Sequence, residues 1–202
     1  MTLRTLTVTA AALCALVLAP LAIAADPATE ARAVIGQTVQ DVIAILEDGD
    51  RDTAARRDAI EKIAHERFDF RTMSKLVLAK NWKRLSKEQQ GEFVTEFTEY
   101  LANDYGSRIE RYEQEQVDIV GERVAKRGDV TVKTMIVGGA NNGAEVDYRM
   151  RNRKQGWKII DVVIEGISLV ANFRDQFRDV MGREGPVTLI EKLKEKNASS
   201  GA

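Results

Sequence analysis

A chain of 202 residues is long enough for one ordinary domain with a sizeable core, because domains commonly contain about 100–200 residues. It carries 30 basic and 31 acidic residues, which gives a formal net charge of −1, and the mature part contains no block of five or more like charges. This balance excludes binding to nucleic acid or to an anionic bilayer by bulk electrostatics.

The first 24 residues have the pattern of a secretory signal peptide. Arg4 precedes an almost uninterrupted apolar run over residues 10–24, and the run ends in Ala-Ile-Ala, a small-x-small cleavage signal. An uncleaved membrane anchor is the alternative, although such a helix needs about 20 apolar residues and usually charges beyond them. Cleavage after Ala24 removes Cys14, the single cysteine, so the mature chain is expected to contain no disulfide and to depend on packing.

Apolar residues spaced three and four apart predict four helices in the first half of the mature chain. The first runs through Ala31, Ile35 and Leu46 and stops at residues 48–50. The other three are predicted over residues 52–66, from about residue 69, and after Ser86 to about residue 111. The segment SKEQQ that opens the fourth helix is typical of a capping box, in which a serine and a glutamine three residues later cap the helix reciprocally.

From about residue 116 the apolar period changes from helical to two, which predicts four strands. The strands are expected at residues 117–125, 130–137, 144–153 and 157–165, and the connections between them contain the glycines that tight antiparallel turns need. A helix from Leu169 to Val180 and a short closing helix over residues 187–196 follow. We expect one domain over residues 25–197 and a disordered tail over residues 198–202.

Four strands after a block of helices predict an α+β fold in which helices cover one face of an antiparallel sheet. Strand alternation places an apolar face on the last three strands, with charged residues on the opposite face. In the first strand two registers compete, because Val117 and Ile119 alternate in one and Val120 and Val124 in the other.

The mature sequence offers few parts for catalysis. His65, its single histidine, lies on a charged stretch, which favours a solvated ion-pairing role over a hydrolytic set or a metal site. The glycine-rich residues 138–143 are typical of a hairpin turn and not of a nucleotide cradle. A proton-transfer enzyme with Tyr148 as the donor is an alternative, but Asp147 and Asp161 alternate onto the opposite face. Neither a metal nor a cofactor is expected.

Apolar surface is therefore the candidate site. Plain core is the ordinary interpretation of Val, Ile and Phe stripes. Several helices with such stripes facing one sheet, in a secreted protein without a catalytic set, nevertheless favour a pocket for an apolar ligand.

Three segments also carry a resemblance to a known family: FDFRTMSKLVLAKNW at residues 68–82, the SKEQQ cap leading into Phe93 and Phe97, and WKIIDVVIEGISLVANFRDQF at residues 157–177. In this order they resemble the periplasmic phospholipid-binding proteins of the MlaC or toluene-tolerance type. The resemblance implies a nuclear-transport-factor-like fold, with a curved sheet of about four strands covered by helices. It implies a bound glycerophospholipid as cargo and no enzyme activity.

The resemblance further implies a carrier in the periplasm of a Gram-negative envelope. Its expected partners are an inner-membrane ABC-type lipid transporter and an outer-membrane lipoprotein or porin complex, and its expected role is to maintain outer-membrane lipid asymmetry. An enzyme on the same fold and an envelope adaptor with a solid core are the alternatives.

The expected lipid-binding residues are the inward face of the sheet and the helix residues that face it. They are Phe70, Met73, Val77, Phe97, Leu101, Tyr105, Val132, Thr134, Ile136, Val146, Tyr148, Met150, Ile160, Val162, Ile164 and Ile167. Replacing Val162 by a charged residue is expected to lower lipid occupancy in a protein that still folds. Arg149, Arg151, Arg153 and Lys154 form a basic strand end, either a solvated face or a contact for an acidic partner or a lipid phosphate.

Overall fold

The structure, a computed structural model, describes residues 26–109, 112 and 114–200, so the predicted signal peptide lies outside the described residues. In chain order the elements are α1 (Pro27–Glu47), α2 (Thr53–Arg67), α3 (Phe70–Leu78), the 3₁₀ helix η1 (Ala79–Arg84), α4 (Lys87–Ile109), β1 (Gln116–Val124), β2 (Val130–Val137), β3 (Glu145–Arg153), β4 (Gly156–Ile164), β5 (Ile167–Ser168), α5 (Leu169–Arg183) and α6 (Pro186–Ser200). Within this part of the chain, none of the helices combines the length and the apolarity that a membrane crossing requires.

The five strands form one open antiparallel sheet in the order β1-β2-β3-β4-β5. The predicted α+β fold is confirmed, and the four predicted strands lie within one residue of the observed ones. The two-residue strand β5 was not predicted, because so short a segment carries no alternation of its own. It follows the turn at Gly166, whose φ of +76° a glycine adopts without strain.

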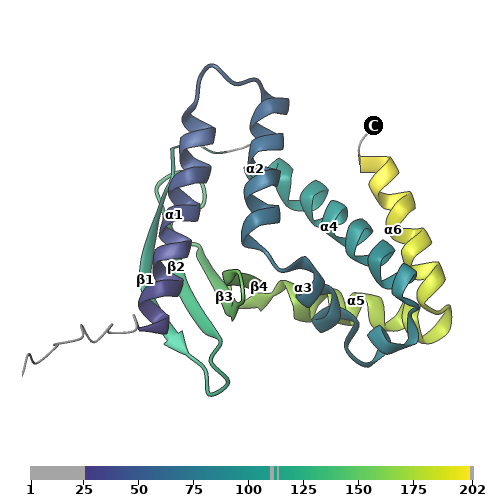
Figure 1. Ribbon diagram of the computed structural model, residues 1–202. Helices are drawn as coiled ribbons and strands as arrows, with labels where there is room; N and C mark the ends of the chain where they lie inside the picture. The colour runs from purple at the N-terminus through teal and green to yellow at the C-terminus, as the bar shows by residue number, and fades with distance from the viewer. Residues whose placement is uncertain (1–25, 110–111, 113, 201–202) are drawn as a thin grey trace, which may run out of the picture.

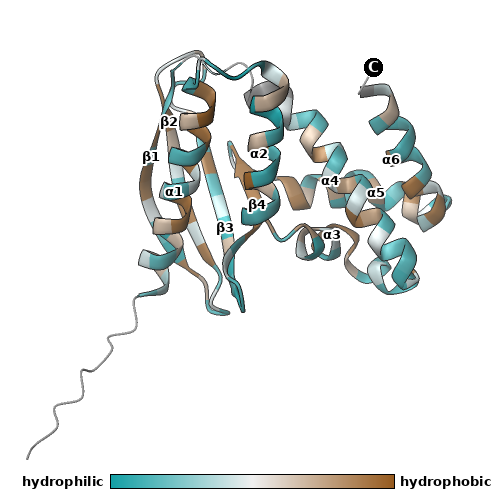
Figure 2. Cartoon of the chain, turned by 45° about the horizontal axis from the view of Figure 1, so that its top comes forward, coloured by the Kyte–Doolittle hydropathy of each residue, from teal (hydrophilic) through white to brown (hydrophobic). Residues whose placement is uncertain are grey.

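Helix α1 covers one face of the sheet, which we call the inner face, and contacts β1, β2 and β4 (Figures 1 and 2). Asp26 caps the first turn of α1, and Pro27 occupies its first position, where a missing N–H costs nothing. Ala31 and Ile35 are buried against the sheet. The indole nitrogen of Trp157 on β4 donates to Glu30 at 2.9 Å, which fixes the start of α1 to the sheet.

Helices α3 to α6 form a second layer beside strands β4 and β5 of the sheet (Figure 1). Its centre is an aromatic cluster of Phe93, Phe97, Phe173 and Phe177, whose neighbouring ring centroids lie 5.3–6.1 Å apart. The predicted capping box at the start of α4 is confirmed, since the Gln89 N–H donates to the Ser86 hydroxyl at 3.2 Å and the Ser86 N–H to the Gln89 side chain at 3.0 Å.

Two β-bulges alter the predicted alternation. In β1 the register shifts between Ile119 and Gly121, which pairs Ile119 with Thr134 and leaves Val120 exposed. Val117 and Ile119 therefore lie on the inner face before the bulge, and Val124, which pairs with Val130, lies on that face after it. In β4 a shift at Ile160 places Ile159 opposite Met150. The uninterrupted alternation predicted through Ile160 was wrong, because the bulge adds one residue to the strand.

The C-terminal end also differs from the prediction. Helix α6 continues to Ser200, so a tail that begins at residue 198 was wrong for residues 198–200. Asn197 gives the physical reason, because its buried side chain donates to the Glu96 carbonyl and carboxylate on α4, both at 3.0 Å. These bonds hold the last turns of α6 against α4.

Candidate functional site

The inner face of the sheet has two ends that differ in burial. We call the first the closed end and define it as Val130, Val132, Met150 and Ile159, whose side chains are all 0% exposed. Val130 pairs with Met150, and Met150 with Ile159, so the four residues form one continuous patch over three strands. The first half of α1, with Ala31 and Ile35, completes this packed core.

The other end of the same face is only half-buried. We call it the open end and define it as Ile119, Ile136, Val146, Tyr148 and Ile164. Thr134 pairs with both Ile119 and Val146, and Val146 pairs with Ile164, so these side chains lie on neighbouring strands. Each of them therefore keeps apolar surface that the protein itself does not bury.

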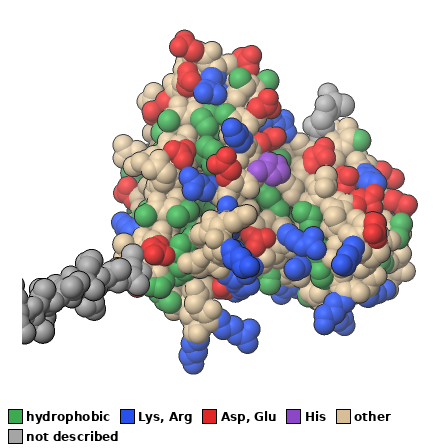
Figure 3. Space-filling view, viewed as in Figure 1, with side chains coloured by type: hydrophobic (Ala, Val, Ile, Leu, Met, Phe, Trp, Pro, Cys, Tyr) green, Lys and Arg blue, Asp and Glu red, His purple; other side chains and the backbone are tan. Residues whose placement is uncertain are grey.

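The helices near the open end repeat this pattern. In the second half of α1 the apolar residues Val39, Val42, Ile43 and Leu46 are half-buried, whereas the first half contributes fully buried residues. Helix α2 has no buried residue at all. Figure 2 shows hydrophobic and hydrophilic bands mixed along both helices, and Figure 3 shows apolar side chains reaching the surface along α1 and towards α2. A helix that flanks a core normally buries an apolar stripe along its length, and neither the second half of α1 nor α2 does so.

Polar contacts join α2 to its neighbours. Arg67 pairs with Asp41 on α1 at 3.5 Å. Arg57 donates to the Asn103 side chain on α4 at 2.7 Å and pairs with Glu61 on its own helix. Helix α2 therefore lies between the two layers, anchored by side chains that retain contact with water and not by a buried apolar face.

The polar side chains within and beside the open end, Tyr148 and Thr134, are neutral. The Thr134 hydroxyl donates to the Val146 carbonyl and is thereby satisfied. Desolvation of the hydroxyl raises the pKa of Tyr148 to about 12 although the residue as a whole is only half-buried, so its phenol stays protonated at physiological pH. A surface of this kind suits hydrocarbon, because none of its side chains brings a charge that would need a partner.

A tyrosine–carboxylic acid pair is not assembled inside. Asp161 accepts from the Ser168 hydroxyl at 2.6 Å and from the Val170 N–H at 3.1 Å, so it stabilises the start of α5. Asp147 pairs in register with Lys133 and Val163, away from the strand positions of the inner face. His65 is exposed and lies edge-on to Phe70, with ring centroids 5.6 Å apart. The described residues contain no cluster of His, Cys, Asp or Glu that would hold a metal ion.

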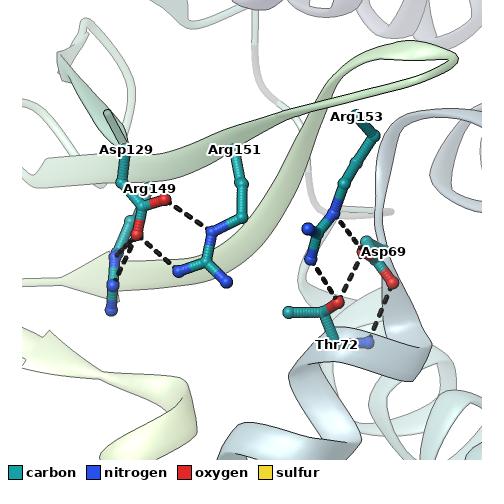
Figure 4. A network of polar contacts seen from close by, with 6 residues as sticks. All are labelled: Asp69, Thr72, Asp129, Arg149, Arg151 and Arg153. Atoms are coloured by element: carbon teal, nitrogen blue, oxygen red, sulfur yellow. Dashed lines mark hydrogen bonds and ion pairs between the residues drawn. The ribbon is translucent and has the colours of Figure 1, made fainter. Parts of the chain in front are cut away.

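The outer face of the sheet carries an ordered polar network (Figure 4). The buried carboxylate of Asp129 accepts from Arg149 at 2.7 Å and from Arg151 at 2.5 Å. Hydrogen bonds from Arg151 and Arg149 lower the pKa of Asp129 despite its desolvation. Arg153 donates to Asp69 at 3.1 Å. The arginines of the predicted basic strand end are thus held by carboxylates and are not simply solvated.

The structure divides the residues predicted to bind lipid into three groups. Phe70, Tyr105, Ile136, Val146, Tyr148 and Ile164 are half-buried; Met73, Val77, Phe97, Leu101, Val132, Thr134, Met150, Ile160 and Val162 are buried; Ile167 is 62% exposed. The prediction omitted Ile119, because the register of β1 was ambiguous. It also omitted Val39 and its neighbours on α1, although their helical stripe was visible in the sequence. Lipid contact by any of these residues stays a prediction.

Comparisons with known proteins identify the family of this chain. The model of the family described as MlaC protein matches residues 36–195. The toluene tolerance protein ttg2D of Pseudomonas putida is 30% identical over 133 residues, which cover 63% of this chain and 60% of that protein. The intermembrane phospholipid transport system binding protein MlaC of Haemophilus influenzae is 24% identical over 124 residues, which cover 59% of this chain and 58% of that protein. The chain thus spans less than two thirds of these relatives' lengths.

A solved structure extends the likeness to the fold. The phospholipid-binding protein from Ralstonia solanacearum, in complex with a phospholipid, superposes with a TM-score of 0.77 at 26% sequence identity. The match covers 86% of this chain and 99% of that one. Because the family model also matches most of the sequence, this chain belongs to the MlaC family.

Proposed function

We propose that this chain is a periplasmic phospholipid carrier that holds acyl chains against the open end of its sheet. The observation that carries the proposal is the uneven burial of one apolar face, because side chains of the same type are solid core at one end and half-exposed at the other. The names of a transport-system relative and of a lipid-bound structural neighbour support a phospholipid as the ligand.

The energetics explain why a carrier needs such a surface. Two acyl chains contain about 30 methylenes, and at about 0.8 kcal/mol each their exposure to water costs on the order of 25 kcal/mol. A lipid therefore does not cross an aqueous compartment unaided. A carrier must offer an apolar site about as favourable as the bilayer, since a much tighter site would trap the lipid.

The same argument determines how lipid is exchanged. The tails must not enter water during transfer, so the open end has to face a donor or acceptor that excludes water. The partners that we propose are an inner-membrane ABC-type lipid transporter and an outer-membrane lipoprotein or porin complex. The carrier performs no chemical step and requires no cofactor. Its contribution to the outer membrane is to maintain lipid asymmetry.

The test is the lipid content of the purified protein. The full chain is expressed with its first 24 residues, purified from the periplasmic fraction without detergent, and extracted with organic solvent for mass spectrometry. We expect phospholipid in near-stoichiometric amount. A folded, monodisperse sample without lipid would contradict the carrier and favour an adaptor with a solid interior. Protein found only in the cytoplasmic or membrane fraction would contradict the proposed location.

A further inference from the structure

A second surface, away from the open end, carries an unusual charge. Residues 70–87, which comprise α3, η1 and the start of α4, contain no acidic residue. Their cations are all exposed: Arg71, Lys75, Lys80, Lys83, Arg84 and Lys87. Figure 3 shows a group of basic side chains over this part of the molecule. In a chain whose net charge is close to zero, such a run concentrates positive potential on one face.

We call the surface formed by residues 70–87 the basic face. Its six cations form no ion pair with a carboxylate in the described part of the chain. Among the described residues, no salt bridge involves any of them, whereas the arginines of β3 are each held by an aspartate. Arg71 and Lys75 instead lie over the ring of Trp82, at 5.6 and 5.8 Å from its centroid. Their charges are therefore positioned by an aromatic ring that leaves them available to an external anion.

A small pocket lies at the edge of the basic face, between the end of α3 and α5. Its volume is about 320 Å³, and its apolar lining comes from Val77, Leu78, Phe177 and Met181. Lys80, Arg174 and Arg178 also line it. The Arg174 guanidinium donates twice to the Leu76 carbonyl, at 3.0 and 2.8 Å, and so ties α3 to α5 beside the pocket.

We propose that the basic face is a docking site for an acidic segment of a partner protein, which inserts one large apolar side chain into this pocket. Charge complementarity requires the acidic neighbours, and the apolar lining requires the inserted side chain. The concave shape disfavours a bilayer, which proteins bind with protruding apolar residues. The exposed large apolar residues of the described chain, Val120, Val124, Ile167 and Val187, all lie outside α3, η1 and α5.

The test uses nuclear magnetic resonance with the mature protein and three probes. The probes are an acidic peptide with a central phenylalanine (EDEFDED), the same peptide with alanine at the centre (EDEADED), and vesicles of phosphatidylcholine and phosphatidylglycerol. We expect the phenylalanine peptide to shift the backbone amides of residues 77–81 and 174–181. The alanine peptide is expected to bind about tenfold more weakly, because it buries no large side chain.

Charge reversal distinguishes the basic face from general electrostatic attraction. The variant Lys80→Glu/Lys83→Glu is expected to lower the affinity for the phenylalanine peptide about tenfold or more at low salt. The matched control Lys126→Glu/Arg127→Glu makes the same change of charge in the exposed turn between β1 and β2 and is expected to have little effect.

Three results would overturn the proposal: amide shifts that map elsewhere, equal affinity for both peptides, or vesicle binding that Lys80→Glu/Lys83→Glu abolishes while peptide binding is absent. The last result would assign the basic face to a membrane. The titration is run on lipid-loaded and on delipidated protein, so its outcome does not depend on whether the chain carries lipid.

Discussion

The closed and open ends of the sheet share strands, face and residue types, yet only one of them is packed. Val130, Val132, Met150 and Ile159 are completely buried, while Val146 and Ile164, on the same face, are not. The difference arises from the covering helices. The first half of α1 places buried residues on the closed end, whereas the second half of α1 and the whole of α2 contribute none.

The comparison shows that an apolar sheet face can combine stability and binding by dividing them along its strands. Side chains at the closed end lose all contact with water on folding and contribute to stability at about 25 cal/mol per Å² of apolar surface. At the open end the same contribution is incomplete until a ligand covers the surface. Substitutions at the closed end should therefore mainly lower stability, and substitutions at the open end should mainly lower ligand binding.

The largest expected effect comes from a matched pair on β4. Ile159→Ala removes a fully buried side chain beside Met150 and should lower the free energy of unfolding by about 2–4 kcal/mol. Ile164→Ala makes the same chemical change at the open end and should cost about 1 kcal/mol or less, because its surroundings are already partly exposed. Urea unfolding of delipidated protein measures both, and equal losses would refute the division into two ends.

The next effect concerns lipid. Ile164→Glu places a charge on the open end, where the carboxylate can still reach water, so the protein should fold but copurify with much less phospholipid. Val162→Glu is a less clean test than the sequence indicated, because Val162 is only 7% exposed and a charge there also strains the core. The control Lys62→Glu, an exposed position on α2, should leave the lipid content unchanged. Full lipid content in folded Ile164→Glu protein would place the acyl chains elsewhere.

The difference between the two ends also shows which features of the fold could be predicted from the sequence. Helices and strands followed from periodicity and caps, since local patterns determine them, as the reciprocal bonds of Ser86 and Gln89 confirm. The inner face was predicted for the same reason. The bulge at Ile160 was not predicted. The sequence alternates regularly through this residue, and only the pairing with β3 shows that Ile160 has no partner opposite it.

The difference in burial along the inner face could not be predicted from the sequence, for a different reason. Val130 and Val146 are the same residue type on the same face of the sheet, yet Val130 is completely buried and Val146 is half-buried. The stripes of α1 likewise look uniform from Ala31 to Leu46, although only their first half is buried. The prediction therefore mixed core residues such as Phe97 with half-buried ones such as Tyr148.

A smaller effect is expected on the outer face behind the closed end. Hydrogen bonds from Arg151 and Arg149 hold the pKa of Asp129 below its ordinary value of 3.8, so the ionised carboxylate stabilises the folded state. This contribution is fully present above the ordinary pKa and is lost as pH falls through the lowered one. Asp129→Asn should cost about 1–2 kcal/mol at neutral pH, since both arginines remain partly exposed.

The pH dependence provides the check on this prediction. The stability difference between the wild type and Asp129→Asn should shrink below about pH 4, where the wild-type carboxylate also becomes neutral. Lipid content should not change, because Asp129 lies on the outer face. A stability difference that persists unchanged into acid would show that the carboxylate's charge is not what stabilises this part of the sheet.

The smallest effect is expected from Tyr148→Phe at the open end. Burial raises the pKa of Tyr148 from its ordinary value of 10.0 to about 12, so its hydroxyl is neutral under physiological conditions and its removal should change stability by about 0.5 kcal/mol or less. The folded state binds this proton more tightly than the unfolded state, so wild-type stability should fall as pH rises from about 10 to 12. The free energy of unfolding should fall less steeply over this pH range in Tyr148→Phe. The ultraviolet titration of the variant should lack the tyrosine that ionises at the highest pH. Unchanged lipid content would fit a purely apolar role for the ring, whereas a large loss of lipid would mean that the hydroxyl binds the ligand directly.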